Sequence, residues 1–197
     1  MGCPASEKML FLRKRNTMEI VSILILFLLS FQVMPVALGI DIQKTSFIHI
    51  TGSVVFLVLG QLLLFLTGIW LGNRFMHLVS GINRYILFVG FFLIAVRFSM
   101  EAFRVRKGER TYVMGKSVTY ILPAVAQAVN TFLAGILFYF LPLNLSSDII
   151  YLALFSFVFS VLFAFIKNKT LALPAISLLY MTGGGLLILI SFYFLFF

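Results

Sequence analysis

Cysteine, histidine and acidic residues are scarce in this chain of 197 residues. It contains one cysteine, two histidines and six aspartate or glutamate residues. The single cysteine, Cys3, excludes an internal disulfide and any zinc or iron–sulfur site built from several cysteines. His49 and His77 are isolated, with no carboxylate or cysteine at metal-ligand spacing. Because a Gly-rich phosphate loop followed by lysine is also missing, the sequence predicts neither an enzyme nor a bound cofactor.

Charged residues are few overall, whereas apolar residues dominate. Hydrophobic residues make up 62% of the chain and charged residues 11%, while a soluble domain is roughly half apolar and a quarter charged. One soluble core could not bury so much apolar surface, but a lipid bilayer can contact it directly. The net charge of +9 does not indicate nucleic-acid binding, because the basic residues lie in short connectors between apolar runs. The predicted partner is therefore the bilayer, with no nucleic acid.

Long apolar runs define the predicted fold. A helix needs about 20 mostly apolar residues to cross the hydrocarbon core. Six runs qualify: Met18–Ile40, Phe47–Leu71, Ile82–Phe103, Ser117–Leu141, Asp148–Ile166 and Leu171–Phe197. Strict alternation of apolar and polar residues is missing, which argues against a membrane β-barrel. The sequence predicts an all-α, polytopic membrane protein with six transmembrane helices.

Basic residues predict the orientation of these helices. Connectors one, three and five together contain Lys44, Arg104, Arg106, Lys107, Arg110, Lys116, Lys167 and Lys169. Connectors two and four contain only Arg74 and Arg84. By the positive-inside rule, the odd connectors are cytoplasmic and both termini lie outside. The basic extension 1–17 disagrees with this orientation, and one interpretation is that synthesis starts at Met18. A cleaved signal peptide is disfavoured, because the apolar run is long and lacks a small-x-small cleavage site.

The chain also divides into two similar halves. Residues 18–103 and 117–197 each contain three spans, and the basic loop 104–116 separates them. When the fourth span is aligned with the first, Met34 falls opposite Asn130 and Gly39 opposite Gly135. Since each half has an odd number of spans, the halves would have opposite orientations. Inverted repeats of this kind are common in transporters, where the substrate site lies near mid-membrane between the repeats.

Ionisable residues within the membrane need a physical reason. Arg97 and Glu101 are spaced i and i+4, which places them on one face of the third span. They either belong to a substrate or proton pathway, or neutralise each other while Arg97 reaches toward the headgroups. Asp41 and Asp148 lie at the expected membrane boundaries and are interpreted as interfacial charges.

Uncharged polar residues at membrane depth form a second group of candidates. Gln127, Asn130 and Thr131 lie on one face of the fourth span, where they could line a cavity or bond to a neighbouring helix. Gln61 in the second span could line the same cavity or bridge a helix contact. Pro35, beside Met34 in the first span, is expected to bend that helix and free a backbone carbonyl. The run Gly183–Gly185 is interpreted as a site of close helix packing.

Three short segments resemble the MntP manganese efflux pumps, a bacterial family in the LysE transporter superfamily. The segment 97–104, RFSMEAFR, is similar to the R-x-x-x-E-G-F stretch of that family. The segment 124–130, AVAQAVN, is similar to its A-x-A-x-S-x-D, and the segment 68–72, GIWLG, resembles its G-W-x-x-G. The resemblance implies six helices and transport of Mn²⁺ across a bacterial cytoplasmic membrane.

The departures from the family pattern bear on the ion site. Family carboxylates in the first, second and fourth helices fall on Met34, Gln61 and Asn130, so a thioether and two amides replace them. Mn²⁺ favours carboxylate, carbonyl and water oxygens. Amide oxygens could still bind it, but without negative charge to offset the loss of its hydration shell. No confident metal ligand set is therefore predicted.

Two functional hypotheses follow. In the first, the chain is a transporter of a small cation or solute, and its pathway passes Met34, Gln61, Gln127, Asn130 and Thr131. Arg97 and Glu101 would lie at the cytoplasmic mouth, with Glu101 as the proton acceptor. In the second, the chain has kept the scaffold, lost transport, and acts as a membrane partner in envelope or spore development.

Overall fold

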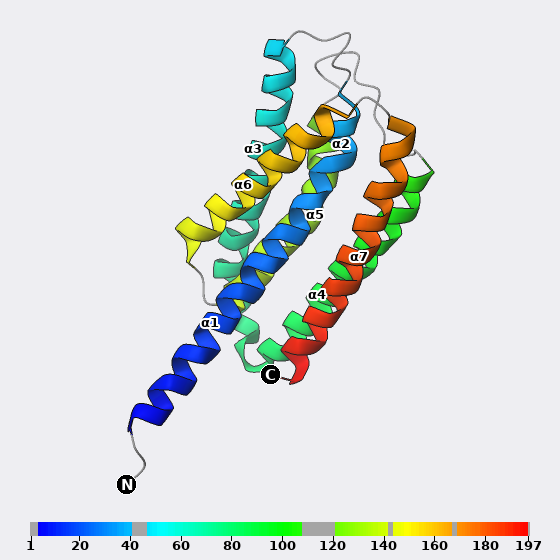
Figure 1. Ribbon diagram of the computed structural model, residues 1–197. Helices are drawn as coiled ribbons and strands as arrows, with labels where there is room; N and C mark the ends of the chain where they lie inside the picture. The colour runs from blue at the N-terminus through cyan, green and yellow to red at the C-terminus, as the bar shows by residue number, and fades with distance from the viewer. Residues whose placement is uncertain (1–3, 41–46, 108–120, 142–143, 167–168, 197) are drawn as a thin grey trace.

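The computed structural model describes residues 4–40, 47–107, 121–141, 144–166 and 169–196 (Figure 1). These residues form helices α1 (Pro4–Leu29), α2 (Met34–Leu38), α3 (Phe47–Phe75), α4 (Asn83–Arg106), α5 (Ile121–Leu137), α6 (Leu145–Ala164) and α7 (Lys169–Phe196). The three short 3₁₀ segments Ser30–Val33, Met76–Ile82 and Phe138–Phe140 join or extend them. No strand occurs in the described residues, which confirms the all-α prediction.

Five of the helical segments are long and apolar enough to cross a membrane. They are Asn16–Leu38, Ile48–Val79, Asn83–Arg106, Leu145–Ala164 and Leu171–Phe196. A sixth apolar helical segment, Gln127–Phe140, is shorter, and it belongs to α5 and the 3₁₀ turn after it, which together run from Ile121 to Phe140, or about 30 Å. The predicted start of this span, at Ser117, lies outside the described residues. The chain is thus a multi-pass α-helical membrane protein.

A break in the α-helix interrupts the first span between Leu29 and Met34. The α-helix stops at Leu29, Ser30–Val33 forms a 3₁₀ segment, and α2 begins at Met34 with Pro35 in its first turn. Proline suits the first turn of a helix, but its ring clashes with the carbonyl four residues earlier and it has no N–H to donate. The 3₁₀ segment therefore lies where Pro35 was expected to disturb the helix, and the bend itself stays a prediction.

The outer surface of the bundle is apolar, as lipid contact requires. Large hydrophobic side chains are exposed along every long span, for example Leu63 at 61%, Leu93 at 60% and Leu189 at 65%. The first span differs, because Ile25 to Ile40 are buried except for Phe27, which is half-buried. This span is therefore the centre of the bundle, and the others pack around it.

The most extensive helix pair is α4 with α7 (Figure 1). Phe98 of α4 stacks on Tyr180 of α7, with ring centroids 4.6 Å apart and planes 18° apart. Ser177 donates a hydrogen bond of 2.9 Å to the carbonyl of Ala102. A Cβ atom at Gly183 would lie 3.1 Å from the Phe98 ring, and one at Gly184 would contact the Ser99 hydroxyl. The interpretation of these glycines as a packing surface is confirmed for Gly183 and Gly184, whereas Gly185 faces open space.

Helices α3 and α5 form the second close pair, through glycine on both sides. A Cβ atom at Gly68 would contact the carbonyl of Phe132 and lie 3.1 Å from Cα of Gly135. A Cβ atom at Gly135 would in turn contact the carbonyl of Phe65. Gly72, one turn after Gly68, leaves only 2.7 Å between such a Cβ and the carbonyl of Ile136. Small residues four apart allow membrane helices to approach backbone to backbone, and they do so here.

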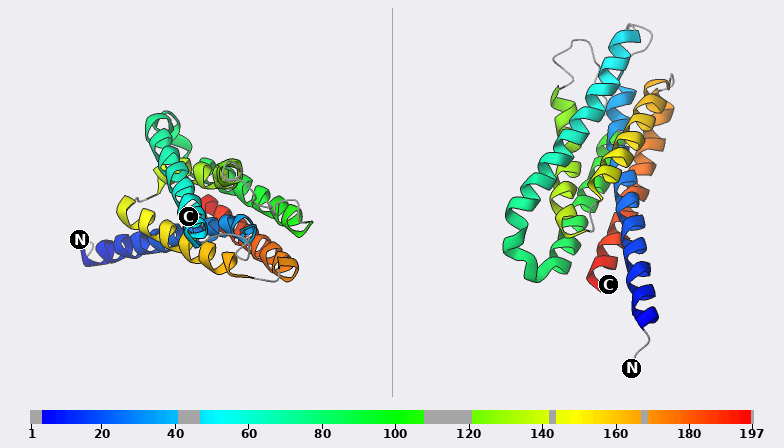
Figure 2. Two further views of the ribbon diagram at one scale, coloured as in Figure 1. Left: turned by 90° about the horizontal axis from the view of Figure 1, so that it is seen from above. Right: turned by 90° about the vertical axis from the view of Figure 1, so that its left-hand side faces the viewer.

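Successive spans alternate in direction, and their packing is nearly unchanged when the two halves are exchanged (Figures 1 and 2). In this exchange, each of the first three spans takes the place of the corresponding span in the second half. The α4–α7 contact and the α3–α6 contact then each correspond to themselves. The α3–α5 contact corresponds to the contact of α6 with α1 and α2. Two inverted three-helix repeats would produce this arrangement.

Candidate functional site

Gln61 of α3 joins four helices through hydrogen bonds. Its Nε2 donates to the carbonyl of Leu29 at 3.0 Å and to the Thr131 hydroxyl at 3.2 Å. Its Oε1 accepts a bond of 2.9 Å from the Ser156 hydroxyl of α6. All three side chains, Gln61, Thr131 and Ser156, are fully buried. The α-helix ends at Leu29, and Gln61 binds the carbonyl of this last residue.

Because both ends of the Gln61 amide are bonded, this residue holds α1, α3, α5 and α6 together. Of its two predicted roles, the structure displays the helix bridge. Thr131 also belongs to this bridge. Gln61 also lies beside the break in the first span, because it bonds to the carbonyl of Leu29.

Replacement of Gln61 by leucine is expected to destabilise the bundle by about 1–3 kcal/mol, because it leaves buried hydroxyl and carbonyl groups unpaired. The apparent melting temperature in detergent should fall by several degrees. Thr67→Ala is the matched control on the same helix, because Thr67 is exposed and bonds only to the carbonyl of Leu64. If Gln61→Leu melted like the parent protein, the bridge would contribute no stability.

Three other buried amides have no such partners. Gln32, Gln127 and Asn130 are 0%, 5% and 0% exposed. Neither the nitrogen nor the oxygen of any of these side chains is hydrogen-bonded within the described part of the chain. A buried polar group without a partner costs about 1–3 kcal/mol, so three amides together are an expensive feature of a membrane-embedded core.

These three amides belong to elements that touch. Gln32 lies in the 3₁₀ segment Ser30–Val33, which packs against α5 and α6. Gln127 and Asn130 lie on the buried face of α5 that also carries Thr131. Ser160 of α6 is likewise fully buried, and its hydroxyl has no partner among the described residues. The polar core of the bundle is therefore found where the broken first span meets α5 and α6.

Met34 directly follows the broken segment and is 0% exposed, within the main apolar core. With Gln61 and Asn130, all three positions at which the resemblance implies family carboxylates are thus buried rather than exposed to lipid. Gln127 and Asn130 contribute oxygen and nitrogen atoms to this interior, and Met34 contributes only a thioether. Among the described residues, no group of three His, Cys, Asp or Glu side chains could hold a metal ion.

Arg97 and Glu101 form an ion pair on α4, with Nε and Oε1 3.5 Å apart. The Arg97 side chain is 38% exposed and that of Glu101 is 8% exposed. Glu101 lies on the α4 face that packs against α7, next to Ala102 and Phe98. The structure thus displays the mutually neutralising pair, and a pathway role stays a prediction.

Asp148 lies in the first turn of α6, at the boundary of a span as expected, but its side chain is buried. Asp148 is 5% exposed, and its Oδ2 has no hydrogen-bond partner among the described residues. The helix begins at Leu145, three residues before the expected span, so Asp148 lies in the first turn of α6 and faces inward. A pattern in the sequence could have revealed it: Asp148, Leu152, Ser156 and Ser160 recur every four residues, which is one helix face.

Comparison with known protein families identifies the chain. Residues 43–195 match the family described as Putative manganese efflux pump, MntP. The chain belongs to this family. No curated protein and no solved structure matches the chain.

The MntP match confirms the family resemblance and covers five of the six spans. It includes Gln61, Asn130 and the Arg97–Glu101 pair, and begins after Met34. At the level of the family, the match supports a manganese efflux transporter, and the family is described as pumps rather than enzymes. The buried residues of its polar core are uncharged, so which substrate this core could accept is a separate question.

Proposed function

We propose that this protein exports a divalent cation, with Mn²⁺ as the first candidate, from the cytoplasm of a bacterial cell. The observation that carries the proposal is the set of buried amides, Gln32, Gln127 and Asn130, that have no hydrogen-bond partner in the described part of the chain. Oxygen atoms of amides can replace part of the hydration shell of a hard cation. A transport pathway gives these amides a function, and their substrate would offset the free-energy cost of burying them.

The proposed pathway runs between α1–α2, α5 and α6, past Met34 and the buried amides. In the proposed orientation, the ends of α2, α4 and α6 lie in the cytoplasm. Exposed Arg104 and Arg106 at the end of α4 support this orientation. The symmetric helix packing supports a two-repeat transporter, whose site would lie between the repeats. Glu101 is the proposed proton acceptor near the cytoplasmic end.

A neutral core has a physical consequence for the cation. Each missing carboxylate removes a charge–charge attraction of about 4 kcal/mol per unit of cation charge at 4 Å, for an effective dielectric constant near 20. Mn²⁺ would therefore be held weakly and would keep part of its water shell. We expect transport with low affinity, effective only at high cytoplasmic manganese.

Expression in bacteria that lack manganese export tests the proposal. The protein should restore growth in millimolar MnCl₂ and lower cellular manganese, measured by mass spectrometry. Asn130→Ala should lose most of this effect, because it removes a buried amide from the pathway. Asn83→Ala is the matched control, because Asn83 is exposed at the start of α4. Unchanged manganese content with the parent protein would reject manganese as substrate, and full activity of Asn130→Ala would reject the pathway.

One observation favours the alternative, a scaffold that no longer transports. By the resemblance, Gln61 occupies a position where the family has a carboxylate. Both ends of its amide are hydrogen-bonded to neighbouring helices. A former ligand position that now stabilises the bundle fits a protein selected for its fold. Such a protein would act through a membrane partner in envelope or spore development.

A further inference from the structure

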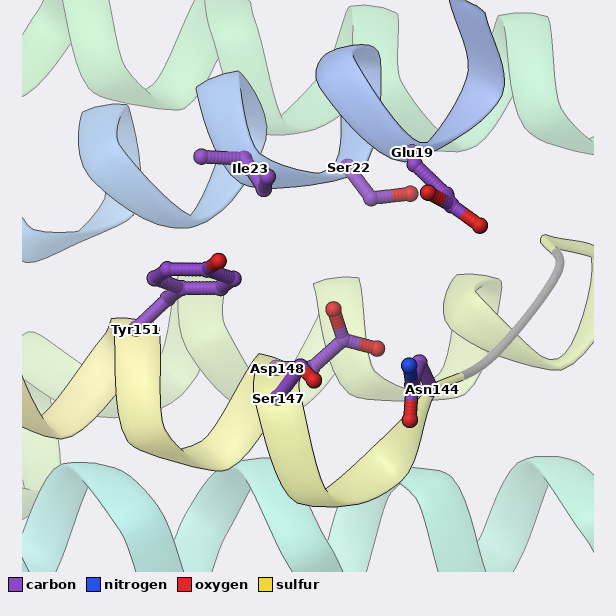
Figure 3. Close-up of a pocket in the computed structure, with 7 residues that line it drawn as sticks. All are labelled: Glu19, Ser22, Ile23, Asn144, Ser147, Asp148 and Tyr151. Atoms are coloured by element: carbon purple, nitrogen blue, oxygen red, sulfur yellow. The ribbon is translucent and has the colours of Figure 1, made fainter. Parts of the chain in front are cut away.

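A pocket between α1 and α6 lies apart from the buried amides, close to the start of α6 (Figure 3). Its volume is about 250 Å³. The lining residues are Glu19, Ser22 and Ile23 of α1, with Asn144, Ser147, Asp148 and Tyr151 from the α6 side. Five of the seven carry oxygen atoms suited to a hard cation, and two of those five are carboxylates.

The pocket has an exposed mouth and a buried base. Glu19 and Asn144 are exposed to solvent, whereas Asp148 is 5% exposed. Figure 3 shows the carboxylates of Glu19 and Asp148 directed into the space between the two helices. Oδ2 of Asp148 has no hydrogen-bond partner in the described part of the chain. A buried carboxylate oxygen that faces a polar pocket requires a proton or a cation there.

We propose that this pocket binds a divalent cation through Asp148 and Glu19. The Ser22 hydroxyl donates its proton to the carbonyl of Met18 at 3.0 Å, so its oxygen lone pairs remain available to a cation. Ser147 and Asn144 add a hydroxyl and an amide oxygen. The volume also admits several waters, which small hard cations usually retain alongside one or two carboxylates.

The buried face of α6 connects this pocket to the polar core. Asp148, Ser156 and Ser160 share that face, and Ser156 bonds to Gln61. Eight residues of helix separate Asp148 from Ser156, which is about 12 Å. An ion that leaves the neutral core would thus meet negative charge at the end of α6. In the proposed orientation this is the outer side, so the pocket receives the ion before release. This role, unlike the binding itself, rests on the proposed function.

Binding of Mn²⁺ to the purified full-length protein in detergent tests the inference. Electron paramagnetic resonance detects free hexaaqua Mn²⁺, and its signal should fall until one ion is bound per chain. Asp148→Asn, which preserves shape, should raise the Kd at least tenfold, and Glu19→Gln should raise it by a smaller factor. Mg²⁺ in excess should displace Mn²⁺, because it prefers the same oxygen ligands.

Glu7→Gln is the matched control. Glu7 lies on α1, twelve residues and about 18 Å before Glu19, so this variant loses one charge from the same helix away from the pocket. It should bind Mn²⁺ like the parent, and all variants should elute as the parent does in size-exclusion chromatography. Parental affinity in Asp148→Asn, or no Mn²⁺ binding by the parent, would overturn the inference; the second result identifies an acid pocket that holds protons only.

The outcome is separable from that of the proposed function. Binding that depends on Asp148, in a protein that exports no manganese, would keep the site and reject the transporter. Export that depends on Asn130, with Mn²⁺ binding indifferent to Asp148, would keep the transporter and reject this site.

Discussion

Asn130→Asp is expected to lower the half-saturating Mn²⁺ concentration for transport at least tenfold. Asn130 is 0% exposed and its amide is unbonded within the described residues, so a carboxylate of the same shape fits without new contacts. At 4 Å and an effective dielectric constant near 20, the attraction to a divalent cation is about 8 kcal/mol. Burying the carboxylate costs several kcal/mol. A net gain of at least ~1.4 kcal/mol gives the tenfold change.

Uptake of radiolabelled Mn²⁺ into inside-out membrane vesicles measures this effect. Asn83→Asp is the control, because it adds the same charge at an exposed position. The triple variant Met34→Asp, Gln61→Glu, Asn130→Asp extends the test. If only the triple variant transports and the natural chain does not, the protein is a scaffold that has lost its ion site. Equal uptake by all variants and the parent would show that Asn130 does not contact the ion.

Gly135→Leu is expected to prevent the bundle from folding. Cα of Gly135 approaches α3 so closely that even a Cβ atom would contact the carbonyl of Phe65 and lie 3.2 Å from Cα of Gly68. Since both neighbours are backbone, no side-chain rotation can relieve the clash, and α3 must move away from α5. That movement would also separate Gln61 from Thr131. We expect a loss of at least ~3 kcal/mol, the upper end for overpacking.

Fluorescence-detected size-exclusion chromatography of a fusion protein measures the folded fraction. Gly135→Leu should shift the protein to aggregates or abolish its peak. Gly52→Leu is the matched control: it lies on α3, and a Cβ there meets nothing within 4 Å. The control should give a normal peak, because leucine is also a better helix former than glycine by about 1 kcal/mol. A normal peak for Gly135→Leu would show that the α3–α5 contact is looser than the structure indicates.

The spans could be predicted because the bilayer imposes a length and a composition on each helix. At Pro35 the sequence predicts a bend, and the structure places a 3₁₀ segment directly before it, since the steric effect of proline is local to its own helix. The apolar run predicts that the fifth span starts at Asp148. The structure begins that helix at Leu145, so the carboxylate lies within the helix and is buried against α1.

The partners of the polar side chains could not be predicted. The amides of Gln61 and Asn130 are equivalent in chemistry and in burial, yet among the described residues one is bonded to three groups and the other to none. The difference depends on how α3 crosses α5, and Gly68 and Gly135 determine that crossing together. Whether a buried amide stabilises the fold or faces a pathway is therefore a property of the assembled bundle.

The exchange symmetry of the helix packing has a consequence for motion. In the proposed two-repeat transporter, an exchange of conformations between the halves would rebuild an equivalent set of helix contacts. Two such states would differ in energy only through the unlike side chains of the halves. A pump needs two states of this kind, close in energy and facing opposite compartments. The break at Ser30–Val33 has no counterpart at the aligned residues of α5, and this difference would favour one state over the other.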